Sequence, residues 1–167
     1  MKQTVRFKLV LTPAQQRLLL ETMHAFNAAC NAIGEQVFAA QTTNIFALQE
    51  RTAGMLHEQF RLPPRLAFQA IFTTCERYKR RQQVKPVFQE EEAIVVDEQI
   101  ASFHGLTRIS LLTIAGRMLV PFLIQRARLQ RARRATRQTA YGQATLQYGD
   151  GQFFLEVTLE SSSAVIG

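Results

Sequence analysis

The sequence predicts an α+β fold, in which a small β-barrel carries an inserted domain of about three helices. Three observations support this fold. Apolar residues alternate near the N-terminus, recur every three or four positions over residues 13–81, and alternate again after residue 85. Because a lone first strand has to pair with other strands, we expect it to join the later ones, which makes the helices an insertion.

The first strand is expected at residues 4–11, where apolar side chains alternate with Thr4, Arg6 and Lys8. One face of this strand is therefore apolar and the other is basic. Residues 12–15, Thr-Pro-Ala-Gln, combine a capping box with proline at the first helical position, which predicts a helix start. The helix that follows carries an apolar stripe typical of core packing, at Leu19, Met23, Phe26, Cys30, Ile33 and Val37.

Two further helices are predicted before the pattern changes. The cluster Thr42, Thr43 and Asn44 ends the first periodicity, and a second helix runs over residues 45–57. The Leu-Pro-Pro sequence at residues 62–64 starts a third helix. The side of the third helix that we expect to be buried consists of Ala67, Ile71, Thr74 and Tyr78.

The end of the third helix is cationic. Its last turns and the residues after them carry Arg77, Lys79, Arg80, Arg81 and Lys85. One explanation is that the negative end of the helix dipole favours cations there. The other is that the cluster contacts nucleic acid. On the second explanation, Lys79, Arg80, Arg81 and Lys85 are candidate binding residues.

The remaining pattern is that of β-strands. We expect strands at residues 94–96, 107–114 and 118–124, with a turn at Ala115 and Gly116. A hairpin then turns at residues 149–151, Gly-Asp-Gly. Its inward-facing residues are expected to be Ala144, Leu146, Tyr148, Phe153, Leu155, Val157 and Leu159.

No arrangement of residues predicts an active site. The acidic residues at 90–92, 97 and 98 lack a nearby histidine in the sequence, so we interpret them as a solvated face. His24, His57 and His104 are scattered, and phosphate-loop, nucleophile-elbow and zinc-protease motifs are absent from the sequence. We therefore expect no catalytic residue, no metal site, no cofactor and no small-molecule substrate.

The cysteines and the apolar runs indicate a reducing compartment. Cys30 and Cys75 fall on apolar helical stripes, which favours two buried free thiols over a disulfide, and a disulfide over a zinc site. The apolar run at residues 109–124 contains Arg117 and Pro121, so it predicts strands rather than a membrane span. Together with the lack of a signal-peptide pattern, this predicts a cytoplasmic protein without a membrane partner.

The strongest functional signal is an arginine-rich segment without acidic residues. Residues 99–149 contain eight arginines and no Asp, Glu or Lys, while residues 1–98 contain twelve basic and ten acidic residues. Guanidinium groups match phosphate oxygens, so a nucleic-acid backbone is the partner that we expect. The alternative is a solvated face on an exposed helix, but such faces normally mix both charges. Six of the arginines are crowded together: Arg126, Arg128, Arg131, Arg133, Arg134 and Arg137.

Several segments of the chain resemble the N-terminal part of TnpB, also called OrfB, a family of transposon-encoded relatives of type V CRISPR effectors. Asn27 and Asn31 match an asparagine pattern of that family's first helix. The other segments that carry the resemblance are residues 5–15, 62–67, 116–122 and 142–158, of which the last is the most specific.

The resemblance implies a fold and a partner. It implies an oligonucleotide-binding-like barrel formed by residues 1–12 and 85–160, with a basic helix at about 125–138, and a helical recognition domain inserted at 13–84. In that family this half binds guide RNA and the guide–target duplex with DNA. Residues 161–167 resemble the start of a RuvC-like domain, and the resemblance implies that the catalytic acids, Mg and structural Zn of the family belong to that domain. The candidate binding residues are then the six crowded arginines, with Arg6, Lys8, Lys79, Arg80, Arg81 and Lys85.

Two other functions remain open at this point. A transposon-derived regulator with a helix-turn-helix would bind duplex DNA without RNA. A docking module for a separately encoded nuclease domain would expose a large apolar edge near residues 153–159 and would not bind RNA alone.

Overall fold

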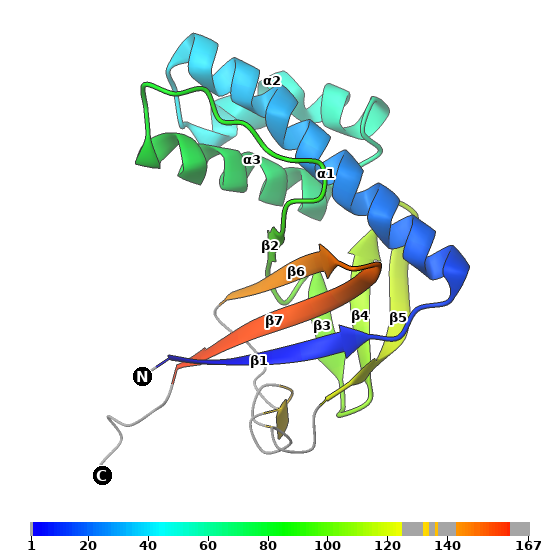
Figure 1. The fold of residues 1–167 in the computed structure, drawn as a ribbon. Helices are drawn as coiled ribbons and strands as arrows, with labels where there is room; N and C mark the ends of the chain where they lie inside the picture. The colour runs from blue at the N-terminus through cyan, green and yellow to red at the C-terminus, as the bar shows by residue number, and fades with distance from the viewer. Residues whose placement is uncertain (1, 125–131, 134–135, 137–142, 161–167) are drawn as a thin grey trace.

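The computed structural model describes residues 2–124, 132, 133, 136 and 143–160 of the chain. The fold is α+β: three helices lie together on one side of a seven-stranded antiparallel sheet that curls into a half-barrel (Figure 1). All three helices follow the first strand and precede the second, as the sequence predicts. Among the described residues, no helix combines the length and the apolar character that a membrane span requires.

The first strand lies in the middle of the sheet, between two strands from the C-terminal half. The strand order is β2-β6-β7-β1-β5-β4-β3, and β1 is antiparallel to both β7 and β5. The expected pairing of the first strand with later strands is therefore confirmed. The strands are β1 (Lys2–Leu9), β2 (Ile94–Val96), β3 (Ala101–His104), β4 (Arg108–Thr113), β5 (Gly116–Leu123), β6 (Gln143–Gly149) and β7 (Gln152–Glu160).

Aromatic contacts inside the sheet show how strongly it curls. Phe103 in β3 lies three strands away from Phe7 in β1, yet their ring centroids are 4.9 Å apart. Phe122 in β5 completes the cluster, with centroids 5.0 Å from Phe7 and 5.7 Å from Phe103. The Phe7–Phe103 and Phe103–Phe122 contacts therefore join inward faces of strands that are not neighbours in the sheet.

The helices begin and end close to where the sequence predicts. They are α1 (Pro13–Ala40), α2 (Ile45–Glu58) and α3 (Pro64–Arg80). The predicted capping box is present, since Thr12 Oγ1 accepts from the Gln15 amide at 3.2 Å and Gln15 Oε1 accepts from the Thr12 amide at 3.0 Å. All six residues of the predicted apolar stripe of α1 are buried.

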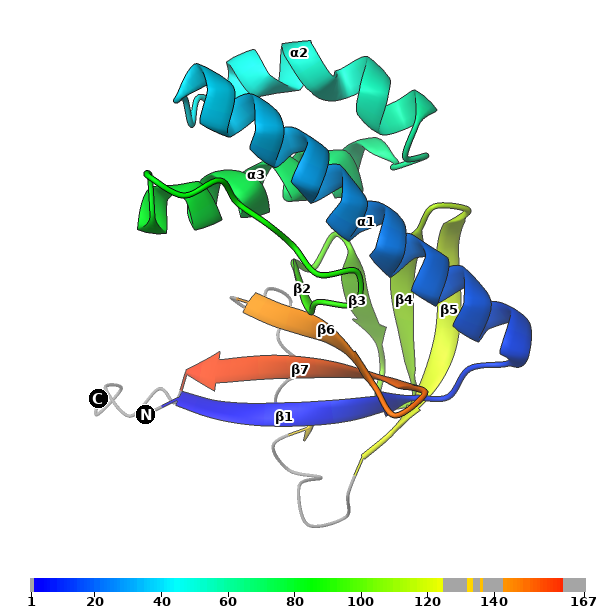
Figure 2. The same cartoon turned by 45° about the horizontal axis from the view of Figure 1, so that its top comes forward.

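The N-terminal half of α1 is attached to two hairpins of the sheet, β4–β5 and β6–β7. Gln16 donates its side-chain amide to the Gly151 carbonyl at 2.8 Å, in the β6–β7 turn. Thr22 Oγ1 accepts from the Ile114 amide at 3.2 Å, in the β4–β5 turn. These contacts fix the direction in which α1 leaves the half-barrel, which is clearest in Figure 2.

The C-terminal hairpin matches its prediction. Asp150 and Gly151 have φ of 52° and 73°, as the two-residue turn that joins β6 and β7 requires. The expected inward residues of both strands are buried, apart from Tyr148, which is half-buried.

Several sequence-based boundaries were wrong. β1 ends at Leu9 rather than at residue 11, because the chain leaves the sheet at Val10 to enter the cap of α1, and Val10 is exposed. β3 was not predicted, since four residues are too few to establish an alternation. Ala67 is only partly buried; the buried stripe of α3 also contains Leu66, Gln69, Ala70 and Cys75.

Gly34 in α1 permits a close backbone approach, which generates a stability prediction. A Cβ at Gly34 would lie 2.8 Å from the carbonyl oxygen of Pro86, so Gly34→Ala should destabilise the fold by about 1–3 kcal/mol through overpacking. Gly54 in α2 is the matched control, because nothing lies within 4 Å of the Cβ position. Gly54→Ala should stabilise the protein by about 0.5–1 kcal/mol. Urea unfolding measures the free energy of unfolding of both variants. Equal changes in the two variants would contradict the close packing of Gly34 against Pro86.

The two cysteines generate a second prediction. Cys30 and Cys75 are free thiols with exposures of 0% and 1%, and burial raises the pKa of Cys30 to about 12. Both thiols should react with a disulfide reagent at least about 100-fold more slowly in the native chain than in the unfolded chain. The free energy of unfolding should fall as the pH rises from 9.0 towards 12, because the unfolded thiol ionises first. Rapid native labelling would contradict this burial.

Candidate nucleic-acid interface

A groove of about 550 Å³ runs between α3 and the edge of the half-barrel formed by β2 and β6. Its helical wall presents arginines and aromatic rings, and its sheet wall includes Gln143 at the start of β6. Three arginines and two phenylalanines therefore share one concave surface with the carboxylates of Glu76 and Asp97. The residues of α3 that line it include Arg65, Phe68, Phe72, Thr73, Arg77 and Arg80.

Two ion pairs position α3 over this groove. Near the start of the helix, Arg65 Nη2 donates to Asp97 Oδ2, directly after β2. Near its end, Arg77 donates to Glu92 Oε2 and, at 2.7 Å, to the Val87 carbonyl. The guanidinium of Arg77 also lies 3.8 Å from the centroid of the Phe88 ring.

The linker between α3 and β2 is held against α1 by two asparagines. Asn31 makes a reciprocal pair with Phe88: Nδ2 donates to the carbonyl at 2.9 Å and Oδ1 accepts from the amide at 2.7 Å. Asn27, which is buried, donates to the carbonyls of Glu90 and Glu92 at 3.1 and 3.0 Å. Backbone groups that would otherwise be unpaired are satisfied in this way, so these asparagines have a structural role.

The acidic cluster after α3 is only partly the solvated face that the sequence suggests, because Glu90 and Glu91 are exposed whereas Glu92 and Asp97 are half-buried. Glu91 Oε2 lies 3.3 Å from Nε2 of His24, which is 67 residues away in the sequence. Glu92 and Asp97 form the ion pairs with Arg77 and Arg65 described above. The partners come from α1 and α3, which are distant in sequence, and only the fold brings them together.

The four predicted cations near the end of α3 divide into two pairs. Lys79 Nζ lies 3.1 Å from Glu76 Oε1, and Lys85 Nζ lies 2.8 Å from Glu35 Oε1. Arg80 and Arg81 are exposed, and among the described residues no carboxylate lies within ion-pair distance of either. Arg80 also lines the groove, so it is the most available of the four for a phosphate.

Arg6 and Lys8 lie on the outward face of β1, as the alternation predicts. The Arg6 guanidinium lies 3.8 Å from the centroid of the Phe154 ring, and Arg6 pairs in register with Glu156 on β7. Both residues line a shallow hollow together with Leu123 and Ile124. This hollow is on a different surface from the α3 groove, so the structure does not join all the predicted cations into one site.

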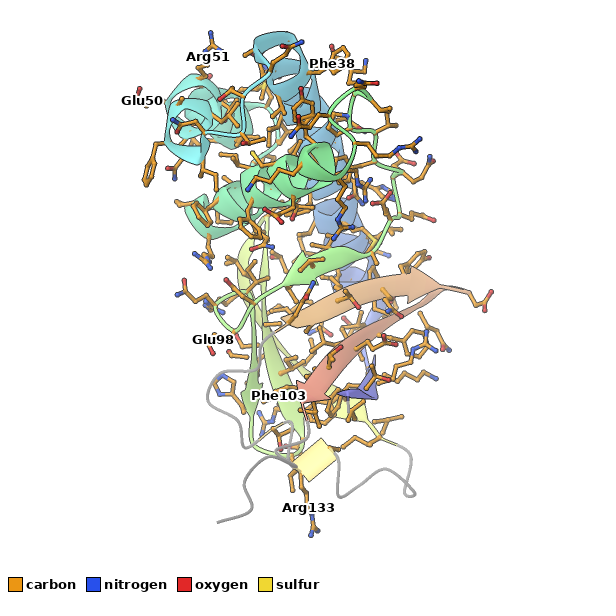
Figure 3. The ribbon with its side chains drawn as sticks, turned by 90° about the vertical axis from the view of Figure 1, so that its left-hand side faces the viewer. Phe38, Glu50, Arg51, Glu98, Phe103 and Arg133 are labelled. Atoms are coloured by element: carbon orange, nitrogen blue, oxygen red, sulfur yellow. The ribbon has the colours of Figure 1, made fainter. Side chains whose placement is uncertain are left out.

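The arginine-rich segment falls largely outside the described residues. The arginines outside them are Arg126, Arg128, Arg131, Arg134 and Arg137. Arg133 is described, has helical backbone and is exposed. Figure 3 shows Arg133 at the end of the molecule opposite Arg51, with its side chain directed away from the sheet.

Sequence reasoning predicted Arg80 as a binding residue but missed the other groove residues on α3. Arg65, Phe68, Phe72 and Arg80 follow one another at helical spacings of three, four and eight, which places them on one side of the helix. This second stripe lies beside the buried stripe and could have been found from its spacing. The opposite wall, including Gln143, could not have been found in this way, because β6 lies more than sixty residues further along the chain.

The described residues contain no group of three or more His, Cys, Asp and Glu side chains that could hold a metal ion. In comparisons with known proteins, no family model matches this chain, and no curated protein matches it significantly.

The division of cations at the end of α3 generates a prediction. Arg80→Gln with Arg81→Gln should weaken heparin retention more than Lys79→Gln with Lys85→Gln, although both double variants lose two charges. The reason is that each lysine would have to leave a carboxylate to reach a phosphate. Each lost phosphate contact should reduce the slope of log affinity against log salt by about 0.7–0.9. Equal retention of the two variants would contradict the assignment.

Proposed function

We propose that this chain is the nucleic-acid-binding half of a TnpB-like, RNA-guided DNA endonuclease, and that it holds guide RNA and the guide–target duplex. The observation that carries the proposal is the segment of residues 99–149, with eight arginines and no acidic residue. Three of these arginines are described, Arg108, Arg117 and Arg133, and none of the three forms an ion pair with a described carboxylate.

The fold supports the proposal at a coarser level. A curled antiparallel sheet with helices inserted after its first strand is compatible with an oligonucleotide-binding-like barrel that carries a recognition domain. In guide-dependent effectors the protein contacts the backbone, and base pairing reads the sequence. An arginine-rich segment suits such a protein, because arginine contacts phosphates irrespective of the base sequence. The proposal assigns no catalytic residue to this chain.

The burial of β7 disagrees with the main expectation of the docking-module hypothesis. This hypothesis requires an exposed apolar edge near residues 153–159. β7 instead lies between β6 and β1, and Phe153, Leu155 and Val157 are each 0% exposed. The regulator hypothesis differs from the proposal in its nucleic acid, since it requires duplex DNA binding without RNA.

The nucleic acid retained by the expressed chain tests the proposal. Sequencing of co-purified RNA should give one structured transcript, enriched over total cellular RNA. Arg131→Gln, Arg133→Gln and Arg134→Gln together should reduce its yield by at least about tenfold, if each lost phosphate contact costs roughly 1 kcal/mol.

A matched variant carries Arg17→Gln, Arg51→Gln and Arg61→Gln, which removes the same charge from three exposed arginines elsewhere. It should retain the RNA. Equal loss from both triple variants would show a response to net charge alone. Binding of duplex DNA with no retained RNA would overturn the proposal in favour of the regulator.

A further inference from the structure

The α3 groove has features that the binding of a phosphate backbone alone does not require. Phe72 is 40% exposed and Phe68, one turn earlier on α3, is half-buried; both line the groove. An aromatic ring that stays accessible in a concave surface offers its flat face to a planar ligand. Aromatic faces that line a cationic groove are suited to stacking with bases.

The charged groups of the groove leave one cation available for a phosphate. The carboxylates of Asp97 and Glu76 line the groove, but Asp97 is bonded to Arg65 and Glu76 to Lys79. Arg77 is likewise occupied by Glu92. Among the described residues, Arg80 lacks such a partner, and it lies on the same side of α3 as Phe72, two helical turns later.

The groove also holds polar groups that can contact a base. Gln143 is exposed on the wall opposite α3, and its amide offers both donors and an acceptor. The Nε of Arg65 and the Oγ1 of Thr73 are shielded from solvent and have no hydrogen-bond partner in the described structure.

The aromatic lining and the size of the groove fit an unpaired nucleotide better than the interior of a base-paired duplex. In a duplex each base is stacked between its neighbours, so its face cannot reach an aromatic side chain in a groove. A volume of about 550 Å³ is instead in the range of sites for single small ligands. An unpaired nucleotide provides a free base face, a base edge and a phosphate at once.

We propose that the α3 groove binds an unpaired nucleotide of a single strand, with its base stacked on Phe72, its base edge towards Gln143 and its phosphate on Arg80. This inference rests on the proposed function, and it adds that the same protein distinguishes single-stranded from paired nucleic acid at this groove. Phe68 extends the stacking surface by one turn, and its own ring is flanked by the Arg65 guanidinium at 5.3 Å.

The test compares Phe72→Leu with Phe46→Leu. Leucine keeps apolar volume but removes the flat ring. Phe46, 80% exposed on α2 and outside the groove, is the matched control. The probes are a mixed-sequence single-stranded RNA, the blunt duplex of the same sequence and free UMP, each titrated into the full chain, with thermal melting used to confirm that both variants fold.

Phe72→Leu should weaken single-strand binding by about 5- to 150-fold and leave duplex binding unchanged. Phe46→Leu should change neither affinity. A 2-aminopurine placed in the single strand should lose fluorescence on binding to the unmodified chain and regain it with Phe72→Leu, because stacking quenches this base.

Three outcomes would overturn the inference. They are an unchanged single-strand affinity in Phe72→Leu, an equal loss for strand and duplex, and a Phe72-dependent affinity for free UMP that matches that of the strand. The last would make the groove a site for free nucleotides. If the unmodified chain binds neither the single strand nor the duplex, the proposed function fails as well. If the unmodified chain binds both, and Phe72→Leu binds them with the same affinities, only the assignment of the groove fails.

Discussion

The architecture depends on how the linker from α3 to β2 is held against α1. Asn27 and Asn31 bond its backbone, and Gly34 allows the Pro86 carbonyl to approach the helix to a distance that a Cβ would not permit. Arg77 of α3 bonds the other side of the same linker. Because β2 begins where this linker ends, these contacts determine the position of the sheet edge relative to both helices.

The same contacts between segments distinguish cations that are paired with a carboxylate from cations that are free to bind another anion. Arg65, Arg77 and Lys85 are engaged by carboxylates from other elements and contribute to holding the helices in place. Exposed ion pairs of this kind are individually weak, so each is better understood as orienting a segment than as stabilising the fold. Arg80 and Arg133 are exposed and lack a described carboxylate partner. Among the described residues, the folded structure therefore separates cations that already hold a carboxylate from those that do not.

Local patterns predicted most of the secondary structure. The capping box at Thr12, the Asp150–Gly151 turn and the alternation in β7 depend on neighbouring residues alone, so they could be inferred from sequence. β3 could not, because four residues are stabilised by pairing with β4 rather than by their own pattern.

The site was less predictable because it depends on contacts between distant segments. The Glu91–His24 and Asp97–Arg65 contacts each join residues more than thirty positions apart, and nothing local marks them. The groove combines α3 with the start of β6 for the same reason. Of the predicted binding residues, Arg80 lines this groove, while Arg6 and Lys8 occupy a separate surface.

The central claim is that the acid-free, arginine-rich segment neutralises a polynucleotide backbone. The most direct measurement is the salt dependence of RNA affinity for the unmodified chain. If six phosphates are contacted, the slope of log association constant against log salt concentration should be about −4 to −5. A slope near zero, or an affinity that does not fall between low and high salt, would contradict the account, because backbone neutralisation must release counterions.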